Sequence, residues 1–236
     1  MSAPTALDLL WGTRPRPRRG PRPFLSLERI VTEAIALADA EGLANLSMQH
    51  LAQRLGCAKM ALYRHVPGKA ELVALMVDAA IGDPPQAPTE PGEQPWRAVL
   101  RLWATTISRR YRAHPWAIEA TAGARPMGPN ELAWLETALA GLAGTGLTGA
   151  ERLDAVVLLN GHVRSLIQVT RAGQEDLGEQ IARQVGAVLS AHPDRYPEVL
   201  AAYSDPSPST GRDDALHFGI DRILDGLAAL IAVRSA

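Results

Sequence analysis

Apolar residues along this chain of 236 residues recur every three or four positions and not at every second one. That spacing is the period of an α-helix with one buried face, whereas alternation at every second position would indicate a strand. Because no stretch sustains the strand period, the pattern predicts an all-α protein. Helices are expected over residues 26–42, 47–55, 58–66, 69–81, 95–113, 115–122, 130–144, 149–172, 176–191 and 213–233.

Two of these helices, 47–55 and 58–66, are short and are separated by a tight turn at Gly56 and Cys57. Ser47 is a good N-cap for the first of them, since its hydroxyl can accept a hydrogen bond from a free backbone N–H. Two helices joined by a short turn that contains Gly are typical of a helix-turn-helix, whose second helix enters the major groove of DNA. We therefore expect a three-helix helix-turn-helix DNA-binding domain over residues 26–82, which also includes the apolar helix 69–81.

Arginine and proline dominate residues 1–25, ahead of this domain. Proline recurs almost every second residue at the centre of the segment and removes backbone donors, so no helix is expected there. The segment would form a flexible cationic arm that carries Arg14, Arg16, Arg18, Arg19 and Arg22. Two interpretations stay open: a solvated tail without contacts, or an arm that lies along phosphates or in a minor groove.

Residues 82–95 contain five prolines and two glycines without periodicity, which is typical of a linker. A larger helical domain is expected over residues 95–236. The net charge also differs between the two parts. Residues 1–82 carry 10 basic and 7 acidic side chains, whereas residues 83–236 carry 14 basic and 18 acidic ones. Both lysines of the chain, Lys59 and Lys69, fall in the helix-turn-helix stretch. A basic end on an acidic body indicates nucleic-acid binding by that end.

Other functional classes lack their sequence signals. No apolar run approaches the roughly 18 residues of a membrane span, and the N-terminus has no signal-peptide segment, so we expect a cytoplasmic protein with no membrane contact. The single cysteine, Cys57, cannot form an intrachain disulfide and is expected to be a small buried residue. No Gly-rich phosphate loop, metal-ligand pair or Gly-x-Ser-x-Gly is present, so no catalytic residue, metal or cofactor is expected.

Three motifs follow one another in the helix-turn-helix stretch: Ala52-x-x-Leu55-Gly56, Ala61-Leu62-Tyr63-Arg64-His65-Val66 and Lys69-x-x-Leu72. Together they resemble the tetracycline-repressor (TetR/AcrR) family of bacterial transcription regulators over roughly residues 26–76. Two later stretches, 111–116 and 217–227, look like the C-terminal domain of that type. The DNA-contacting residues, which this resemblance largely implies, are expected to be Ser47, Gln49, Lys59, Met60, Tyr63, Arg64, His65 and Lys69.

The chemistry of these side chains suits the task. Lys59 can reach a phosphate or a guanine edge, and Met60 can pack on a thymine methyl group. As alternatives, Tyr63 would belong half to the core and His65 would be a packed turn residue. Tetracycline-binding members carry tryptophan at the position of Arg64 and glutamine–proline at Lys59–Met60, so the resemblance does not carry their operator over to this chain.

Dimerisation and ligand binding are the two tasks that the resemblance implies for residues 95–236. Two apolar stripes at helical spacing predict a four-helix dimer interface, with an intrachain core as the alternative. They include Val156, Leu159, Val163, Ile167, Ile220, Leu224, Leu227 and Ile231. A pocket is predicted from aromatic residues and one polar helix face, with core packing or an interface network as the alternatives. Its residues are Trp103, Tyr111, Trp116, Trp134, Asn160, Arg164 and Gln168.

Together with these patterns, the resemblance implies a homodimeric repressor that a small apolar or amphipathic effector releases from double-stranded operator DNA. Ligand can act only through its different affinity for two conformations. Two alternatives stay open: a helical ligand-binding protein or enzyme with a vestigial head, and a ligand-independent regulator controlled by a protein partner.

Overall fold

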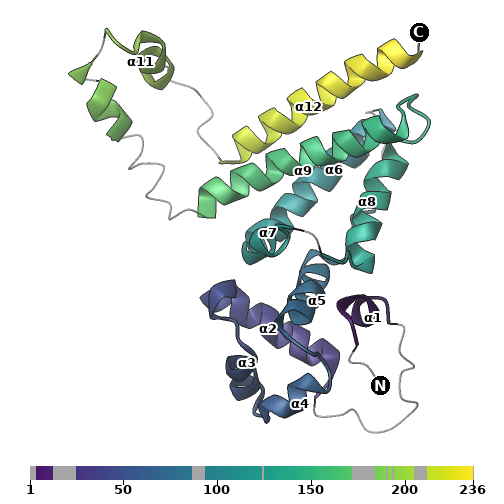
Figure 1. Cartoon of the computed structure of the whole chain (residues 1–236). Helices are drawn as coiled ribbons and strands as arrows, with labels where there is room; N and C mark the ends of the chain where they lie inside the picture. The colour runs from purple at the N-terminus through teal and green to yellow at the C-terminus, as the bar shows by residue number, and fades with distance from the viewer. Residues whose placement is uncertain are drawn as a thin grey trace.

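The computed structural model describes residues 4–12, 25–86, 94–123, 125–171, 184–189, 191–192, 194–204 and 212–235. All regular elements in these ranges are helical, which confirms the predicted all-α fold (Figure 1). The helices are α1 (Ala6–Leu10), α2 (Leu27–Glu41), α3 (Met48–Leu55), α4 (Lys59–Tyr63), α5 (Lys69–Ile81), α6 (Pro95–Ala113), α7 (Trp116–Ala120), α8 (Pro129–Gly141), α9 (Gly149–Arg171), α11 (Pro197–Ser204) and α12 (Arg212–Ser235), with a 3-10 turn, η1, at Leu43–Asn45.

The N-terminal head consists of α2, α3, α4 and the first turns of α5. Its helices start where the sequence predicts, because Ser26 Oγ accepts a hydrogen bond from the backbone N–H of Arg29 at 3.2 Å. Ser47 caps α3 in the same way. Apolar side chains from all four helices share one core, in which Leu51 and Leu62 are fully buried. This core fixes how α4 is presented relative to α3.

Helix α5 connects the head to the body. Its side chains are buried on most sides, from Leu72 near the head to Ile81 at its far end, as expected of a helix that is apolar nearly all round. It packs on α1 and α2 and also on α6, α7 and α8 (Figure 1). The hydrophobic core therefore runs without interruption from head to body. The domain boundary at residues 82–95 stays a prediction.

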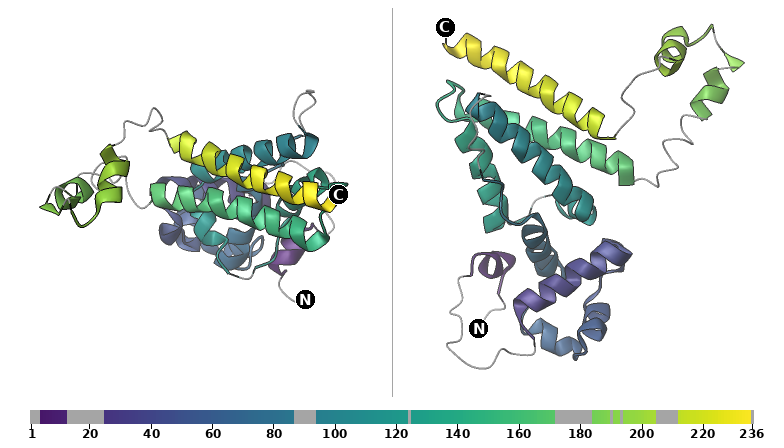
Figure 2. Two further views of the ribbon diagram at one scale, coloured as in Figure 1. Left: turned by 90° about the horizontal axis from the view of Figure 1, so that it is seen from above. Right: turned by 180° about the vertical axis from the view of Figure 1, so that it is seen from behind.

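The body is a bundle of α6, α8, α9 and α12. Figure 2 shows α9 and α12 side by side on the face turned away from the head. They approach closely because Gly219 of α12 leaves room for the His162 ring of α9, where a Cβ would overlap the imidazole. Ion pairs Arg97–Asp225 and Arg101–Asp221 join α6 to α12. The bundle thus combines close helix packing with ion pairs at its rim.

Helix α1 corrects the expectation that residues 1–25 contain no helix. The prolines of the segment lie at position 4 and from position 15 onward, which leaves a proline-free run between them. Within that run the Thr5 backbone N–H donates to Asp8 Oδ2 at 2.9 Å and the Asp8 N–H donates to Thr5 Oγ1 at 3.2 Å. This capping box satisfies donors that a helix start leaves free. The predicted arm arginines (positions 14–22) lie outside the described residues.

Smaller differences concern helix ends. Helix α4 ends at Tyr63 and not at residue 66, since the residue before Pro67 is disfavoured in helical conformation. Helix α8 begins at Pro129, which lacks the N–H that a first turn leaves unpaired.

Helix α11 was not predicted. Of the predicted helix 176–191, residues 184–189 are helical and most of the rest lies outside the described residues.

Candidate DNA-binding surface and ligand cavity

Helix α4 stands at the outer end of the head with its first turn exposed (Figure 1). The chain turns toward it at Gly56, whose φ of 66° and ψ of 34° lie in the left-handed region that favours glycine. Leu62 fills the core and is 0% exposed, whereas Met60 is 71% exposed. Because one side of this short helix is anchored by Leu62, its first turn presents Lys59 and Met60 to the outside. Such a turn can meet base edges in a major groove.

Other predicted DNA contacts surround α4. Lys59 Nζ lies 5.8 Å from the ring centroid of the half-buried Tyr63, which is a cation–π contact. Gln49 and Arg64 are exposed, and Ser47 uses its hydroxyl to cap α3. These residues therefore lie at the start of α3, on α4 and directly after it, and α3 packs against α4. Their contacts with DNA stay predictions.

His65 and Lys69 complete the predicted set. Burial lowers the pKa of His65 and the charge of Arg64 lowers that pKa further, so the imidazole is neutral at physiological pH. Lys69 Nζ donates to the carbonyl oxygen of Leu43 at 3.2 Å, although its side chain is exposed. Positive charge on this surface therefore comes from Lys59, Arg64 and Lys69.

One contact that braces this unit was not predicted. Arg54 Nε donates to Glu33 Oε1 at 2.6 Å and joins α3 to α2. The two residues are 21 positions apart, so no helical spacing connects them in the sequence. An exposed pair of this kind contributes only about 0.2–1 kcal/mol, and its role is orientation more than stability.

Asp39 of α2 marks the first junction between head and body. Trp116 Nε1 donates to Asp39 Oδ1 at 2.6 Å, and His114 Nδ1 lies 2.9 Å from the same oxygen. Trp116 is 1% exposed, and a buried indole N–H requires an acceptor. The junction therefore ties α2 to the start of α7.

Asp78 of α5 marks a second junction. It is 7% exposed and accepts hydrogen bonds from the backbone N–H groups of Asn130 at 2.9 Å and Glu131 at 3.1 Å, in the first turn of α8. Asp78 thereby replaces the side chain that the N-cap of α8, Gly128, lacks, and a Cβ on Gly128 would overlap its carboxylate. Burial raises the pKa of Asp78, while the two amide donors oppose that rise.

A cavity of about 240 Å³ lies between α6, α8 and α9. Four residues predicted for a ligand pocket line it, namely Trp103, Tyr111, Trp134 and Asn160. The other lining residues are Ile81, Ile107, Met127, Glu131, Leu135, Val156 and Val157. Val157 is 70% exposed, so the cavity is open to solvent on its side. An apolar cavity with a few convergent polar groups is the usual form of a small-molecule site.

Aromatic rings form one wall of this cavity. Trp103 and Trp134 meet edge to face with their centroids 5.6 Å apart. Their N–H groups are occupied, since Trp103 Nε1 donates to the Trp134 carbonyl at 2.8 Å and Trp134 Nε1 donates to the Gly82 carbonyl at 2.8 Å. The Tyr111 hydroxyl donates to Asn160 Oδ1 at 3.5 Å, and burial raises the pKa of Tyr111, so the hydroxyl stays protonated. Tyr111 and Asn160 supply two of the polar groups in the lining, and Glu131 supplies a third.

Sequence reasoning missed several lining residues. Ile107 lies one helical turn from both Trp103 and Tyr111, so helical spacing could have identified it. Glu131 is 8% exposed and forms an ion pair with Arg125, with Arg125 Nη1 2.7 Å from Glu131 Oε2. No sequence pattern indicated that this carboxylate would face a cavity, because its orientation depends on how α8 is docked.

Three residues predicted for the pocket lie outside the cavity lining. Trp116 belongs to the junction with Asp39. Arg164 donates to Thr121 Oγ1 at 2.6 Å and to the Ile118 carbonyl at 3.1 Å, which fastens α9 to α7. Gln168 is exposed on α9.

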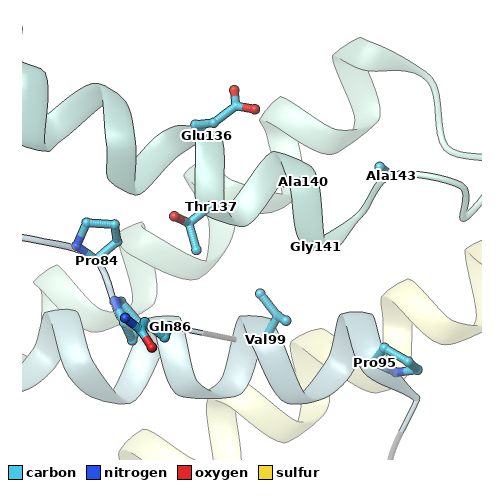
Figure 3. Close-up of a pocket in the computed structure, with 10 residues that line it drawn as sticks. Pro84, Gln86, Pro95, Val99, Glu136, Thr137, Ala140, Gly141 and Ala143 are labelled. Carbon is cyan, nitrogen blue, oxygen red and sulfur yellow. The ribbon is translucent and has the colours of Figure 1, made fainter. Parts of the chain in front are cut away.

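A larger and shallower hollow of about 740 Å³ lies between the start of α6 and α8 (Figure 3). Pro84, Pro95, Val99, Thr137 and Gly141 are among its lining residues. No aromatic ring is among the described residues that line it. The smaller cavity, with its aromatic wall and paired polar groups, therefore has the better chemistry for a ligand site.

Comparison with known families decides what kind of protein carries this head and body. Residues 30–76 match "Bacterial regulatory proteins, tetR family", and residues 87–231 match "Tetracyclin repressor-like, C-terminal domain". The chain belongs to the tetR family. It is a DNA-binding transcriptional regulator, and the predicted resemblance is confirmed.

Individual tetR-family relatives cover nearly the whole chain. It is 37% identical to the HTH-type transcriptional repressor DrrR1 of Streptomyces coeruleorubidus, over 97% of this chain and 86% of the relative. It is 32% identical to an HTH-type transcriptional regulator of Saccharopolyspora erythraea, over 92% of this chain and 90% of the relative. Among solved structures, the Streptomyces coelicolor TetR family protein ActR in complex with actinorhodin superposes with a TM-score of 0.75 at 27% identity, over 88% of this chain and 98% of that one.

Most residues predicted for the tetR-family dimer interface are buried inside this single chain. Val156, Leu159, Val163, Ile167, Ile220, Leu224 and Leu227 are at most 8% exposed, and Ile231 is half-buried. Side chains buried between elements of one chain cannot also form the surface that a second chain covers. The intrachain core, which the pattern left open as the alternative, describes these contacts.

The described residues contain no group of His, Cys, Asp and Glu that could hold a metal ion. None of the helices in the described ranges is long and apolar enough to cross a membrane.

Proposed function

We propose that this tetR-family protein is a homodimeric repressor, and that a small apolar or amphipathic compound in the α6–α8–α9 cavity releases it from its operator. The observation that carries the proposal is the course of α5. This helix begins at Lys69 on the DNA-binding surface and ends at Ile81 in the cavity lining. One rigid element therefore belongs to both sites.

Coupling requires that ligand and DNA prefer different positions of the same element. Asp78 attaches α5 to the first turn of α8, the helix that carries the cavity residues Glu131 and Trp134. A ligand that shifts α8 therefore pulls on α5 and on the head at its other end. The structure of ActR in complex with actinorhodin supports a ligand-responsive role, because a protein of this fold binds a small molecule.

The effector test compares release of operator DNA from two matched variants. Leu135 and Leu139 are both half-buried on α8, but only Leu135 lines the cavity. Leu135→Trp fills cavity space. A compound that releases the wild type from operator DNA should therefore be needed at an at least about tenfold higher concentration to release Leu135→Trp. This factor corresponds to about 1.4 kcal/mol in the free energy of effector binding. Leu139→Trp should respond like the wild type.

Actinorhodin is the first compound to test and a panel of aromatic compounds is the second, with release followed by fluorescence polarisation of a labelled operator duplex. Equal release from Leu135→Trp and the wild type would contradict the assigned cavity. Specific DNA binding that no compound reverses would favour control by a protein partner. Absence of specific DNA binding would favour a vestigial head.

The dimer surface is expected on the exposed faces of α9 and α12. Their exposed large apolar residues are Leu153, Val157, Leu158, Phe218 and Val233. Small exposed residues on the same helices, such as Gly161 and Ala229, permit close approach of a second pair of helices. Two recognition helices one turn of DNA apart require such a pairing.

Leu158→Glu is expected to convert the dimer to a monomer, because the change places an uncompensated charge in an apolar interface. Leu158 is 56% exposed in the single chain, so its own fold should tolerate the change. Light scattering should then give a mass near 25.3 kDa in place of about twice that value. Leu132→Glu, at a 39% exposed leucine of α8, is the matched control and should stay dimeric. A dimeric Leu158→Glu protein would refute the assigned surface.

The relatives are transcriptional regulators, and we infer that this chain has no catalytic activity. Because its partner is operator DNA, we place it in the bacterial cytoplasm.

A further inference from the structure

Helix α1 is a described element outside the tetR-family match, because the matched residues begin at position 30. It lies against α5 (Figure 1). Leu9 and Leu10 pack against the core, whereas Leu7 on the same helix is 54% exposed. A helix of five residues has no stability of its own in water, so docking keeps it folded.

Trp11 extends from α1 to the wall of the cavity. Its Nε1 donates to the backbone carbonyl oxygen of Met127 at 3.2 Å, across 116 positions of sequence. Met127 lines the cavity and belongs to the non-helical residues 125–128. On the inner side, the Gly128 N–H donates to Glu131 Oε2 at 3.2 Å. This part of the wall is therefore held from both sides, and α1 provides the outer contact.

We propose that α1 is a working part of the effector site, in which Trp11 positions the Met127 segment as a wall of the cavity. The inference deepens the proposed function and rests on it. A wall that is in place before binding spares the ligand the cost of ordering it. By reciprocity, a ligand that contacts Met127 in this position stabilises the docked α1 to the same extent. Effector binding therefore stabilises the docked position of α1 near the N-terminus in addition to acting on α5.

The first test needs no ligand. Trp11→Phe keeps an aromatic ring at a 44% exposed position and removes the N–H donor. Hydrogen exchange in the full-length protein is compared at the amides of Gly128, Asn130 and Glu131, which donate hydrogen bonds in this segment. We expect roughly fivefold faster exchange, as loss of one net hydrogen bond implies, with the amides of α3 unchanged. Equal exchange rates in the two proteins would overturn the proposal.

The second test uses 8-anilinonaphthalene-1-sulfonate as a fluorescent probe of apolar cavities. The difference in probe fluorescence between the wild type and Leu135→Trp measures binding in this cavity. Trp11→Phe should weaken that binding roughly fivefold while operator affinity without effector stays unchanged, a separation that general destabilisation would not produce. Leu7→Ala, on the exposed side of α1, should change neither quantity.

Equal probe affinity in Trp11→Phe and the wild type would also overturn the proposal. Failure of every compound to release the operator would instead count against the proposed function. The exchange comparison at residues 128–131 still decides the role of α1 in that case, so the two failures are distinguishable.

Discussion

Replacing Met60 by glutamate should reduce operator affinity at least about 100-fold. Met60 is 71% exposed in the first turn of α4, so the variant keeps its fold but places a carboxylate where phosphates and base edges approach. Like charges brought together at an interface cost on the order of 1–3 kcal/mol, and a dimer meets the contact twice. Each 1.4 kcal/mol is a factor of about ten in the dissociation constant. Fluorescence polarisation with a duplex selected by the wild-type protein measures the loss.

Two variants accompany this measurement. Met60→Leu keeps an apolar side chain and should stay within a few-fold of the wild type. Leu7→Glu introduces the same charge at a 54% exposed residue of α1 and should leave operator binding intact. Normal operator binding by Met60→Glu would remove α4 from the DNA interface.

Trp116→Ala should give the largest loss of stability, about 3–5 kcal/mol, because a fully buried large aromatic side chain is removed. The residue is 1% exposed, and its indole reaches Asp39 in the head. Trp116→Phe keeps most of the packing and loses only that hydrogen bond, so about 1–2 kcal/mol is expected. Urea denaturation at one fixed protein concentration measures both losses, since the stability of a dimer depends on concentration.

Trp11→Ala is the control for this pair. Trp11 is 44% exposed, so its removal should cost less than about 1.5 kcal/mol. We also expect Trp116→Phe to weaken operator binding more than Trp11→Ala does, because Trp116, unlike Trp11, donates a hydrogen bond to α2 of the head. An unchanged urea midpoint in Trp116→Ala would show that the junction contributes little to the fold.

Local signals in the sequence predicted most of the helices and the DNA-binding surface. Ser26 and Ser47 marked helix starts because a capping hydroxyl acts within three residues of itself. Gly56 marked the turn, and Met60, which was expected to meet a thymine methyl group, is exposed as such a contact requires. The same local reasoning was wrong at Ala6–Leu10. The neighbouring prolines led to the expectation of no helix, although Thr5 and Asp8 form a capping box that starts one.

The sequence by itself thus determined the all-α class, the helix-turn-helix and the residues that α4 exposes at the outer end of the head. Only the tertiary structure decided that Trp103 and Trp134 face a cavity whereas Trp116 closes the head–body junction. It also decided that the predicted dimer stripes of α9 and α12 pack mainly within one chain. The physical reason is that hydrophobic periodicity shows which side of a helix avoids water. It carries no information on which other helix, cavity or second chain covers that side.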